Sequence, residues 1–221
     1  MRGRFITFEG GEGSGKSTHA ALLADRLKSF GIDVVVTREP GGSAGAEIIR
    51  HVLLSGAAKP FGPEMETLLF AAARDDHIRN TIAPALALGK WVISDRFIDS
   101  TRVYQGTLGK VDPRMIRGLE RVIVGDVMPD LTFIMDVPAK LGLARASRRR
   151  GGMQADRFEA EAIEFHETLR KAYAALAEHE PERCVLFDGG KPKPAVVDMI
   201  WKTINARLAP LPAARVSENV P

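Results

Sequence analysis

The sequence has little cysteine and no long apolar run, and each scarcity excludes a class of protein. Its one cysteine, Cys184, excludes an intramolecular disulfide and fits a reducing, cytoplasmic location. Because Cys184 lies in an apolar stretch, we expect a buried strand residue and not a reactive thiol. No run approaches the roughly 20 apolar residues of a membrane span, and the start of the chain leads directly into a predicted strand, which leaves no room for a signal peptide.

Neither sign of charge is in large excess, since 31 basic residues nearly balance 28 acidic ones and leave a net charge of +3. The basic residues are spread along the chain, apart from Arg145 and the run 148–150, so we predict no nucleic-acid partner. The 221 residues suffice for one substantial core. We therefore predict a single domain over residues 1–209, followed by a flexible tail over 210–221 that has little to bury.

What the sequence does contain is a complete phosphate-binding loop of the form G-x-x-x-x-G-K-[ST]. An apolar run precedes this loop and a helical pattern follows it, as binding of phosphate requires. The loop amides can surround a β-phosphate, while Lys16 can reach the β- and γ-phosphates and the Ser17 hydroxyl can bind Mg²⁺. The residues that we expect to bind ATP are Gly10, Gly11, Glu12, Gly13, Ser14, Gly15, Lys16, Ser17 and Thr18.

Short apolar runs alternate with longer helical patterns along the rest of the chain, which predicts an α/β fold. We expect a P-loop kinase fold with a five-stranded parallel sheet, helices on both faces and a short mobile lid. The predicted strands are 5–8, 34–37, 91–94, 131–135 and 184–187. The predicted helices are 16–29, 44–55, 64–88, 113–124, 138–148, 159–179 and 194–208.

Charged residues follow four of these strands at once, and parallel strands would bring them to one edge beside the phosphate loop. Asp95 can hold Mg²⁺ through water, and the adjacent Arg96 can hold a second phosphate or neutralise the transferred group. A structural salt bridge is an equal alternative for this pair. We interpret Asp136, which follows the fourth strand, only as the residue that leads into a helix.

The segment from Arg38 to Gly42, with the sequence REPGG, follows the second strand. Its proline stiffens the chain and its two glycines allow a close backbone approach, so Arg38 would be held in one place. A guanidinium there can bind a phosphate through two parallel hydrogen bonds. The alternative is an ordinary surface turn.

Phe70 and Arg74 are four residues apart on one predicted helix, so they share a face, and the three alanines between them leave room along it. A ring that stacks on a base and a guanidinium that bonds its edge would form a base pocket. A core phenylalanine with an arginine that extends to the surface is the more common meaning of this spacing.

The arginines at 148–150 precede two glycines, which predicts a cationic lid over about 147–157. Such a lid could close over ATP and bring an arginine to the γ-phosphate. A solvated basic loop is the alternative.

Taken together, these motifs resemble the bacterial thymidylate kinases over residues 4–208. The matching segments are Phe8–Ser17, Thr37–Gly42, Leu69–Arg74, Asp95–Arg96, Ser100–Thr101, Tyr104–Gly106 and Asp156–Glu159. The resemblance implies transfer of the γ-phosphoryl group of ATP to dTMP, which gives dTDP, with Mg²⁺ and as a homodimer. A P-loop kinase for another nucleoside monophosphate or small acceptor is the remaining alternative, because its donor half would look the same.

The resemblance also implies roles on the acceptor side of the site. Arg38 and Arg96 would hold the dTMP phosphate, and Glu9 and Asp95 would lie near that phosphate and the metal, which Ser17 also binds. Phe70 would stack on thymine, and Arg74 would bond its edge. Further contacts to the base or the deoxyribose are implied for Ser100, Thr101, Tyr104 and Gln105, with Tyr104 placed below the 2′ carbon, where it disfavours a ribonucleotide.

Members of this family differ in where they carry an additional basic residue, either inside the phosphate loop or in the lid. The loop position here is Glu12, so the chain resembles the lid-arginine type. We expect Arg150 to be the catalytic lid residue, with Arg149 as the alternative. The resemblance thus implies the catalytic set Lys16, Arg96, Arg149 and Arg150.

Overall fold

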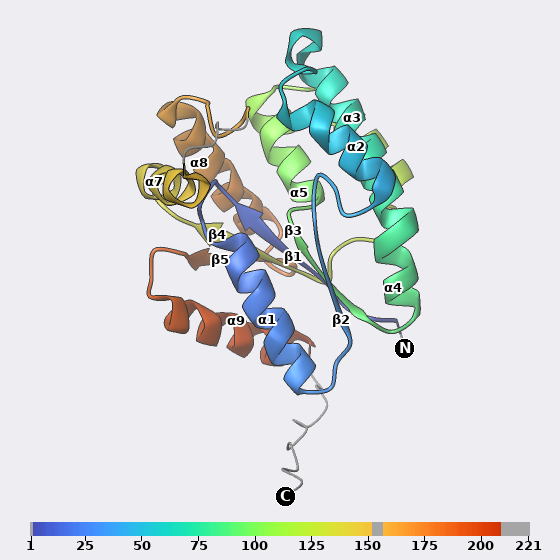
Figure 1. Ribbon diagram of the computed structural model, residues 1–221, viewed down its shortest axis with the longest axis vertical. Coiled ribbons are helices and arrows are strands. Elements are labelled where there is room, and N and C mark those ends of the chain that lie inside the picture. Colours follow the sequence, from blue (N-terminus) through green and yellow to red (C-terminus); the bar gives the residue numbers. More distant parts are fainter. Residues whose placement is uncertain (1, 152–156, 209–221) are drawn as a thin grey trace, which may run out of the picture.

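A computed structural model describes residues 2–151 and 157–208 of the chain (Figure 1). Five parallel strands form one sheet in the order β2-β3-β1-β4-β5. All five predicted strands are confirmed, and each extends one or two residues further. Four of them extend onto the charged residues that we expected to follow them, Glu9, Arg38, Asp95 and Asp136. The strands are β1 (Phe5–Gly10), β2 (Val34–Arg38), β3 (Trp91–Asp95), β4 (Leu131–Asp136) and β5 (Cys184–Asp188).

The helices fall close to where the periodicity predicted them, with three exceptions. The predicted helix 64–88 consists of α3 and α4 joined by a wider π-helical stretch, and the predicted helix 113–124 continues from α6 into a second such stretch. The helical segment 98–108 was not predicted. The α-helices are α1 (Lys16–Ser29), α2 (Ala44–Leu54), α3 (Gly62–His77), α4 (Ala83–Ala87), α5 (Ile98–Thr101), α6 (Pro113–Leu119), α7 (Ala139–Arg150), α8 (Ile163–His179) and α9 (Lys193–Leu208). A short 3₁₀ turn, η1 (Lys59–Phe61), and π-helical stretches η2 (Ile78–Ile82), η3 (Arg102–Leu108) and η4 (Glu120–Val124) complete them.

Helices cover both faces of the sheet, as the continuous apolar strands predicted. Helices α1 and α9 lie together on one face (Figure 1), where Phe8 and Phe133 pack with ring centroids 5.2 Å apart. On the other face, α4 and the start of α5 cover Phe5 and α8 covers Ile134. Every residue of β1 is buried, which fixes the strand that leads into the phosphate loop at the centre of the molecule.

Cys184 is buried in β5 and makes no disulfide, as predicted. Burial, with a further contribution from the charge of Asp99, raises the pKa of its thiol to about 12. The thiol therefore stays protonated at neutral pH and is a poor nucleophile.

The sheet register brings the predicted polar residues to one edge. Asp95 at the end of β3 lies beside Phe8 of β1 and Arg38 of β2. The connection from β1 runs to one side of it, toward β2, and the connection from β3 crosses to its other side, toward β4, so the loop after β1 opens into the crevice where ligands bind in such sheets.

No helix within residues 2–151 and 157–208 is long and apolar enough to cross a membrane. The predicted tail 210–221 and the middle of the predicted lid, 152–156, lie outside the described residues.

Candidate active site

A cavity of about 460 Å³ opens at the edge where the strands end. This volume is typical of a site for a small ligand. Most of the predicted site residues line it: Glu12, Gly13, Ser14, Gly15, Lys16, Ser17, Thr18, Arg38, Phe70, Arg74, Asp95, Arg96, Ser100, Thr101, Tyr104, Gln105 and Arg149. The predicted residues that do not line it are Glu9, Gly10, Gly11 and Arg150.

The phosphate loop is held in shape by packing against α7. Gly13 has a φ of 62°, and a Cβ there would lie 2.0 Å from the carbonyl oxygen of Gly142, so only glycine fits. Lys16 folds back over the loop and donates to the carbonyls of Gly10, at 3.1 Å, and Gly11, at 2.7 Å. Burial and the neighbouring Arg96 lower the pKa of Lys16. A phosphate in the loop would replace these carbonyls with stronger, charged acceptors.

Ser17 and Asp95 form the part of the site that could hold a metal ion, because the Ser17 hydroxyl donates directly to the Asp95 carboxylate. No group of three or more His, Cys, Asp or Glu side chains within 2–151 and 157–208 could form a complete cage. Mg²⁺ does not need one, since it is usually bound by one or two protein oxygens together with phosphate oxygens and water. The two side chains therefore fit a magnesium–nucleotide complex.

Arg96 connects the phosphate loop to the end of β3. Its guanidinium donates to the Glu12 carboxylate at 2.5 Å and to the Gly10 carbonyl at 3.1 Å, and it lies over the Tyr104 ring. Its φ of 74° is unusual for a residue with a side chain, a form of strain that concentrates at functional sites. Burial would raise the pKa of Glu12, but Arg96 and Lys16 outweigh that effect and lower it to about 2. Glu12 is thus firmly ionised.

Glu9 lies behind the cavity wall and not at its surface. Its fully buried carboxylate accepts hydrogen bonds from the backbone of Phe97 and Ser100 and from the hydroxyls of Ser100 and Tyr173. Burial, assisted by the charge of Asp99, raises its pKa to about 7. Glu9 therefore reaches the cavity only through the residues that it positions, above all Ser100.

Three aromatic side chains form the apolar end of the cavity. Phe70 is half-buried and lines it, which fits a ring that is available to a ligand better than a core residue. The ring of Phe158, from the segment after the lid, lies 6.2 Å from Phe70 and 5.3 Å from Tyr104, edge-on to the latter. Phe158 received no role from the sequence, although it stands inside one of the motifs that carried the resemblance.

Arg74 lines the same end of the cavity, yet its side chain is only 3% exposed. It donates to the Glu39 carboxylate at 2.8 Å, to the Thr101 hydroxyl at 3.1 Å and to the Phe97 carbonyl at 3.1 Å. The alternative drawn from the spacing, a core phenylalanine with an arginine that extends to the surface, does not describe this pair. Phe70 is half-buried and lines the cavity, and Arg74 is buried by its hydrogen bonds. Glu39, which also lines the cavity, received no role from the sequence.

Arg38 enters the cavity from the REPGG segment, with about half of its side chain exposed. It pairs with Glu47 of α2 at 2.9 Å. Arg50, one turn further along α2, also lines the cavity and donates to the Pro40 carbonyl at 2.5 Å. Arg50 was not predicted as a site residue, because nothing in its local sequence distinguishes it from an ordinary helix arginine.

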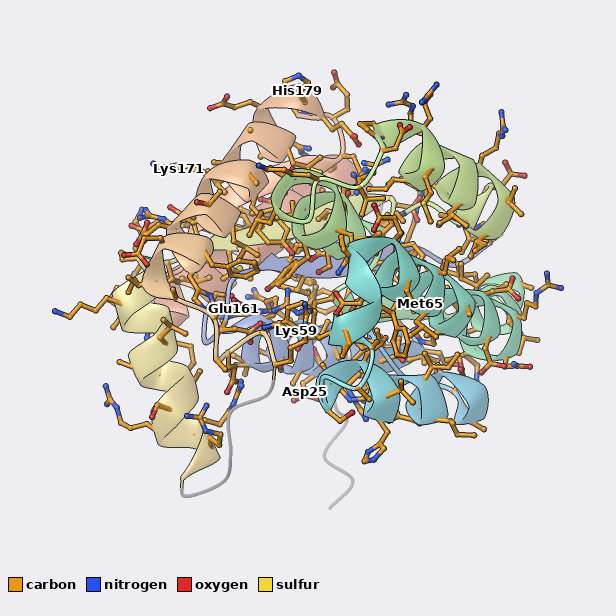
Figure 2. All side chains as sticks on the ribbon, turned by 90° about the horizontal axis from the view of Figure 1, so that it is seen from above. Asp25, Lys59, Met65, Glu161, Lys171 and His179 are labelled. Carbon is orange, nitrogen blue, oxygen red and sulfur yellow. The ribbon has the colours of Figure 1, made fainter. Side chains whose placement is uncertain are left out.

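The lid begins differently from the prediction, because α7 continues through Arg150. Arg149 lines the cavity and pairs with Glu159 at 3.5 Å, while Arg150 pairs with the same carboxylate from outside the lining. The chain beyond the lid returns to the α2–α3 corner. There Lys59 and Glu161 form an ion pair of 3.3 Å at the rim, and Figure 2 shows the two side by side.

The interpretation of Asp136 as a helix-entry residue is wrong. Asp136 ends β4, and its carboxylate accepts two hydrogen bonds from Arg170 of α8. Helix α7 begins at Ala139, whose backbone N–H donates to Glu167. The ion pair on α8 was invisible in the local sequence because its partner lies 34 residues away.

Comparison with known proteins gives consistent matches over nearly the whole chain. The family model for thymidylate kinase matches residues 8–200. The thymidylate kinase of Bradyrhizobium diazoefficiens is 57% identical over 216 residues, covering 98% of this chain and 95% of its own. That of Afipia carboxidovorans is 58% identical over 214 residues, covering 97% and 94%. The crystal structure of thymidylate kinase from Ehrlichia chaffeensis superposes with a TM-score of 0.72 at 34% identity, covering 92% of this chain and 99% of that one.

Proposed function

Since the chain belongs to the thymidylate kinase family and phosphorylates dTMP with ATP as donor, we propose that its cavity holds both nucleotides and that the residues lining it bind them. The observation that carries this proposal is a shared space. The phosphate loop and the aromatic end with Phe70 and Tyr104 open into one cavity of about 460 Å³, with Asp95 and Arg96 also in its lining.

On the donor side, the backbone amides from Gly13 to Ser17 and the Lys16 ammonium bind the β- and γ-phosphates of ATP. Ser17 and Asp95 would hold Mg²⁺, which when bound supplies charge neutralisation on the phosphate oxygens. Lys16 gives up its hydrogen bonds to two loop carbonyls and donates to phosphate instead. Because phosphoryl transfer depends mainly on position and charge, these groups need only to hold the chain of phosphates still.

On the acceptor side, Arg38 and Arg96 hold the phosphate of dTMP, and the base lies against Phe70 with Phe158 beside it. Arg74 donates to the base edge. Tyr104 lies against the deoxyribose and leaves little room for a 2′-hydroxyl. Further polar contacts to dTMP come from Ser100, Thr101 and Gln105, and Glu9 supports this wall from behind.

The lid contributes an arginine to the transition state, in keeping with the lid-arginine type. The corresponding position of the phosphate loop is the acidic Glu12, which forms an ion pair with Arg96. Additional positive charge at the γ-phosphate must therefore come from outside the loop. Arg149 and Arg150 lie at the end of α7 and share the carboxylate of Glu159. Closure over ATP would exchange that carboxylate for the γ-phosphate of the donor.

Acceptor specificity tests the assignment directly. ADP release is measured with dTMP, dUMP, UMP, CMP, AMP and shikimate as acceptors, with ATP held saturating. We expect dTMP to be the best acceptor and the ribonucleotides to be poor. Tyr104→Ala should narrow the gap between deoxyribose and ribose acceptors, while Tyr104→Phe, which keeps the ring, should preserve it. Equal use of all pyrimidine monophosphates by the parent enzyme would contradict the acceptor pocket.

We also propose that the enzyme is a homodimer through an apolar surface on α2 and α3. Four apolar side chains are exposed there at helical spacing: Ile48, Val52, Met65 and Leu68, of which Figure 2 marks Met65. Ile48 is 71% exposed, which is costly for an isoleucine in a monomer. Light scattering should report a dimer that Ile48→Asp dissociates. Leu88→Asp, at an equally exposed leucine on α4's C-terminal end, should leave the dimer intact.

The remaining parts of the proposal are one domain over residues 1–209, with a lid over 147–157, and a cytoplasmic location. A single sheet with a buried apolar cluster on each face supports the first. The unpaired, buried thiol of Cys184 is compatible with the second.

A further inference from the structure

Four side chains form a continuous hydrogen-bonded chain that begins outside the cavity and ends in it. The Thr37 hydroxyl lies 2.7 Å from Nε2 of His77, and Nδ1 of His77 lies 3.0 Å from Oε1 of Glu39. The other oxygen of Glu39 accepts from Nε of Arg74 at 2.8 Å and forms an ion pair with a terminal nitrogen of Arg74 at 2.7 Å. Arg74, the last member, was assigned to the acceptor pocket above. Glu39 also lines the cavity, whereas Thr37 and His77 do not.

The chemistry of the carboxylate fixes the direction of the bond between Glu39 and His77. A carboxylate only accepts, so Nδ1 of His77 carries a proton and donates to Glu39. Nε2 of His77 lies at hydrogen-bond distance from the Thr37 hydroxyl, which can donate or accept. His77 is completely buried and Glu39 nearly so, so the loss of either partner would leave a buried polar group without its hydrogen bond, at a cost in free energy. His77 and Glu39 are therefore held to each other.

Arg74 has little freedom of its own once these bonds are made. The Nε–H donates to Glu39, and one terminal nitrogen donates to the Phe97 carbonyl and forms an ion pair of 2.7 Å with Glu39. The second terminal nitrogen donates one N–H to Thr101. Its other N–H has no hydrogen-bond partner among the described residues and remains for a ligand. Its direction is set by the plane of the guanidinium, and hence by Glu39.

One glycine of the REPGG segment, Gly42, is also explained by this chain. A Cβ on Gly42 would lie 2.4 Å from Nε2 of His77 and 2.3 Å from the Thr37 hydroxyl oxygen. The close backbone approach expected from the sequence is thus made at Gly42, toward Thr37 and His77. A larger residue at this position would displace one of the two side chains.

We propose that His77 is a positioning residue for recognition of the acceptor base: through Glu39, it holds the free N–H of Arg74 at the angle that the base requires. The inference rests on the proposed contact between Arg74 and the base of dTMP. The hydrogen-bonded chain leads from His77 to the acceptor pocket and does not include the phosphate loop. A substitution at His77 should therefore change KM for dTMP and not KM for ATP.

Two amide substitutions separate the two nitrogens of His77. The side-chain nitrogen of asparagine is as many bonds from Cα as Nδ1, and that of glutamine as many as Nε2. His77→Asn can therefore keep the bond to Glu39, whereas His77→Gln loses it and keeps contact with Thr37. We expect His77→Gln to raise KM for dTMP by about 10-fold or more, the range for a hydrogen bond to a charged group, with KM for ATP and kcat within about two-fold. His77→Asn should stay near the parent in all three.

A purely structural role predicts a different pattern. If His77 only fills space, His77→Asn and His77→Gln should lower the midpoint of urea unfolding to a similar extent. KM for dTMP, measured on the folded protein, should then be unchanged in both variants. That result, or equal rises in KM for dTMP and ATP, would overturn the proposal. Thr37→Val supplies a variant at the far end of the chain, where a smaller rise in KM for dTMP is expected because His77 keeps Glu39.

Arg74→Lys distinguishes failure of the inference from failure of the proposed site. If Arg74→Lys leaves KM for dTMP unchanged, the assigned contact between Arg74 and the base is wrong. If Arg74→Lys raises it while His77→Gln does not, the site stands and the positioning role falls. If both raise it, His77→Gln should add less than two-fold in the Arg74→Lys background, since the two act through one contact.

Discussion

The guanidinium of Arg96, which follows β3, donates to the carboxylate of Glu12 in the phosphate loop across 2.5 Å, and both side chains are 14% exposed. The pair thus joins the donor loop to the strand end that faces the acceptor. Tyr104 contributes to the same cluster, with its hydroxyl 3.3 Å from Glu12 and its ring under Arg96. A residue that contacts both halves of the site is well placed to set the distance between donor and acceptor phosphates.

Arg96→Lys should therefore lower kcat by about 10²–10³, the cost of losing one preorganised donor group. A lysine keeps the charge but cannot donate to Glu12, the Gly10 carbonyl and a phosphate at the same time. Steady-state kinetics with both substrates varied is the measurement. Glu12→Gln should cost less, and in the Arg96→Lys background it should cost little more; full additivity of the two changes would show that the pair does not act as a unit.

Glu9 should make stability fall as pH rises. Its folded-state pKa is about 7, against an ordinary value of 4.5, so the folded protein keeps a proton that the unfolded chain releases. Stability from this group is full below pH 4.5 and is lost as pH rises toward 7 and above, by about 3 kcal/mol at 1.4 kcal/mol per unit. Glu9→Gln, which imitates the protonated form, should remove this slope and be more stable than the parent at pH 8.

Urea unfolding at half-unit steps between pH 5 and pH 8 checks this expectation. Glu164→Gln, at an exposed glutamate on α8, is the control for loss of a carboxylate as such. Parallel stability curves for the parent and Glu9→Gln would contradict the assigned protonation. Ionisable groups that the parent and the variants share contribute equally to each curve, and the comparison of variants cancels their contribution.

The phosphate loop and the order of elements could be predicted because their signals are local. The glycine spacing at 10–17 and the apolar runs of the five strands each lie within a few residues. Helix 98–108 escaped prediction because it lacks such periodicity and winds partly as π-helix. Tertiary contacts, not propensity, hold it in place.

The support of the site could not be read from the sequence, because its contacts join distant segments. Glu39 meets Arg74 across 35 residues and His77 across 38. Glu9 meets Tyr173 across 164 residues, and that burial decides its protonation. Residue types that favour ligands are visible in a motif, whereas the residues that hold them are visible only in the fold.

Lys16→Ala should lower turnover by at least 10³ while the protein stays folded. Among the described residues, Lys16 has only loop carbonyls and the Ser14 hydroxyl as hydrogen-bond partners, so the core does not depend on it. Loss of one central cation removes charge stabilisation that grows in the transition state. Turnover near that of the parent, in a variant shown by circular dichroism to be folded, would contradict the assignment of the donor site.

Phe70→Ala should raise KM for dTMP while KM for ATP stays nearly constant. The ring lines the cavity and lies 6.2 Å from Phe158, so a base could lie against it. A stacked base is worth about 1–3 kcal/mol, or roughly 5- to 150-fold in affinity. Phe158→Ala should act in the same direction. Equal losses for both substrates would indicate that Phe70 is a packing residue, which was the alternative drawn from its spacing.

The last prediction concerns the lid arginines, which share one carboxylate. Glu159 is buried and pairs with both Arg149 and Arg150, but only Arg149 lines the cavity, and its side chain is 65% exposed. Either guanidinium can reach the donor only by leaving Glu159, and that exchange places positive charge where the β–γ bond breaks. An arginine in this role is worth about 10³–10⁵ in the rate of GTPases, so even a partial contribution is measurable.

Arg149→Ala combined with Arg150→Ala should lower kcat by about 10² or more, with KM for ATP little changed, because the contact forms in the closed state. Arg148→Ala is the control, one position earlier on α7. The single variants decide which arginine acts, and a double variant within a few-fold of the parent kcat would exclude both.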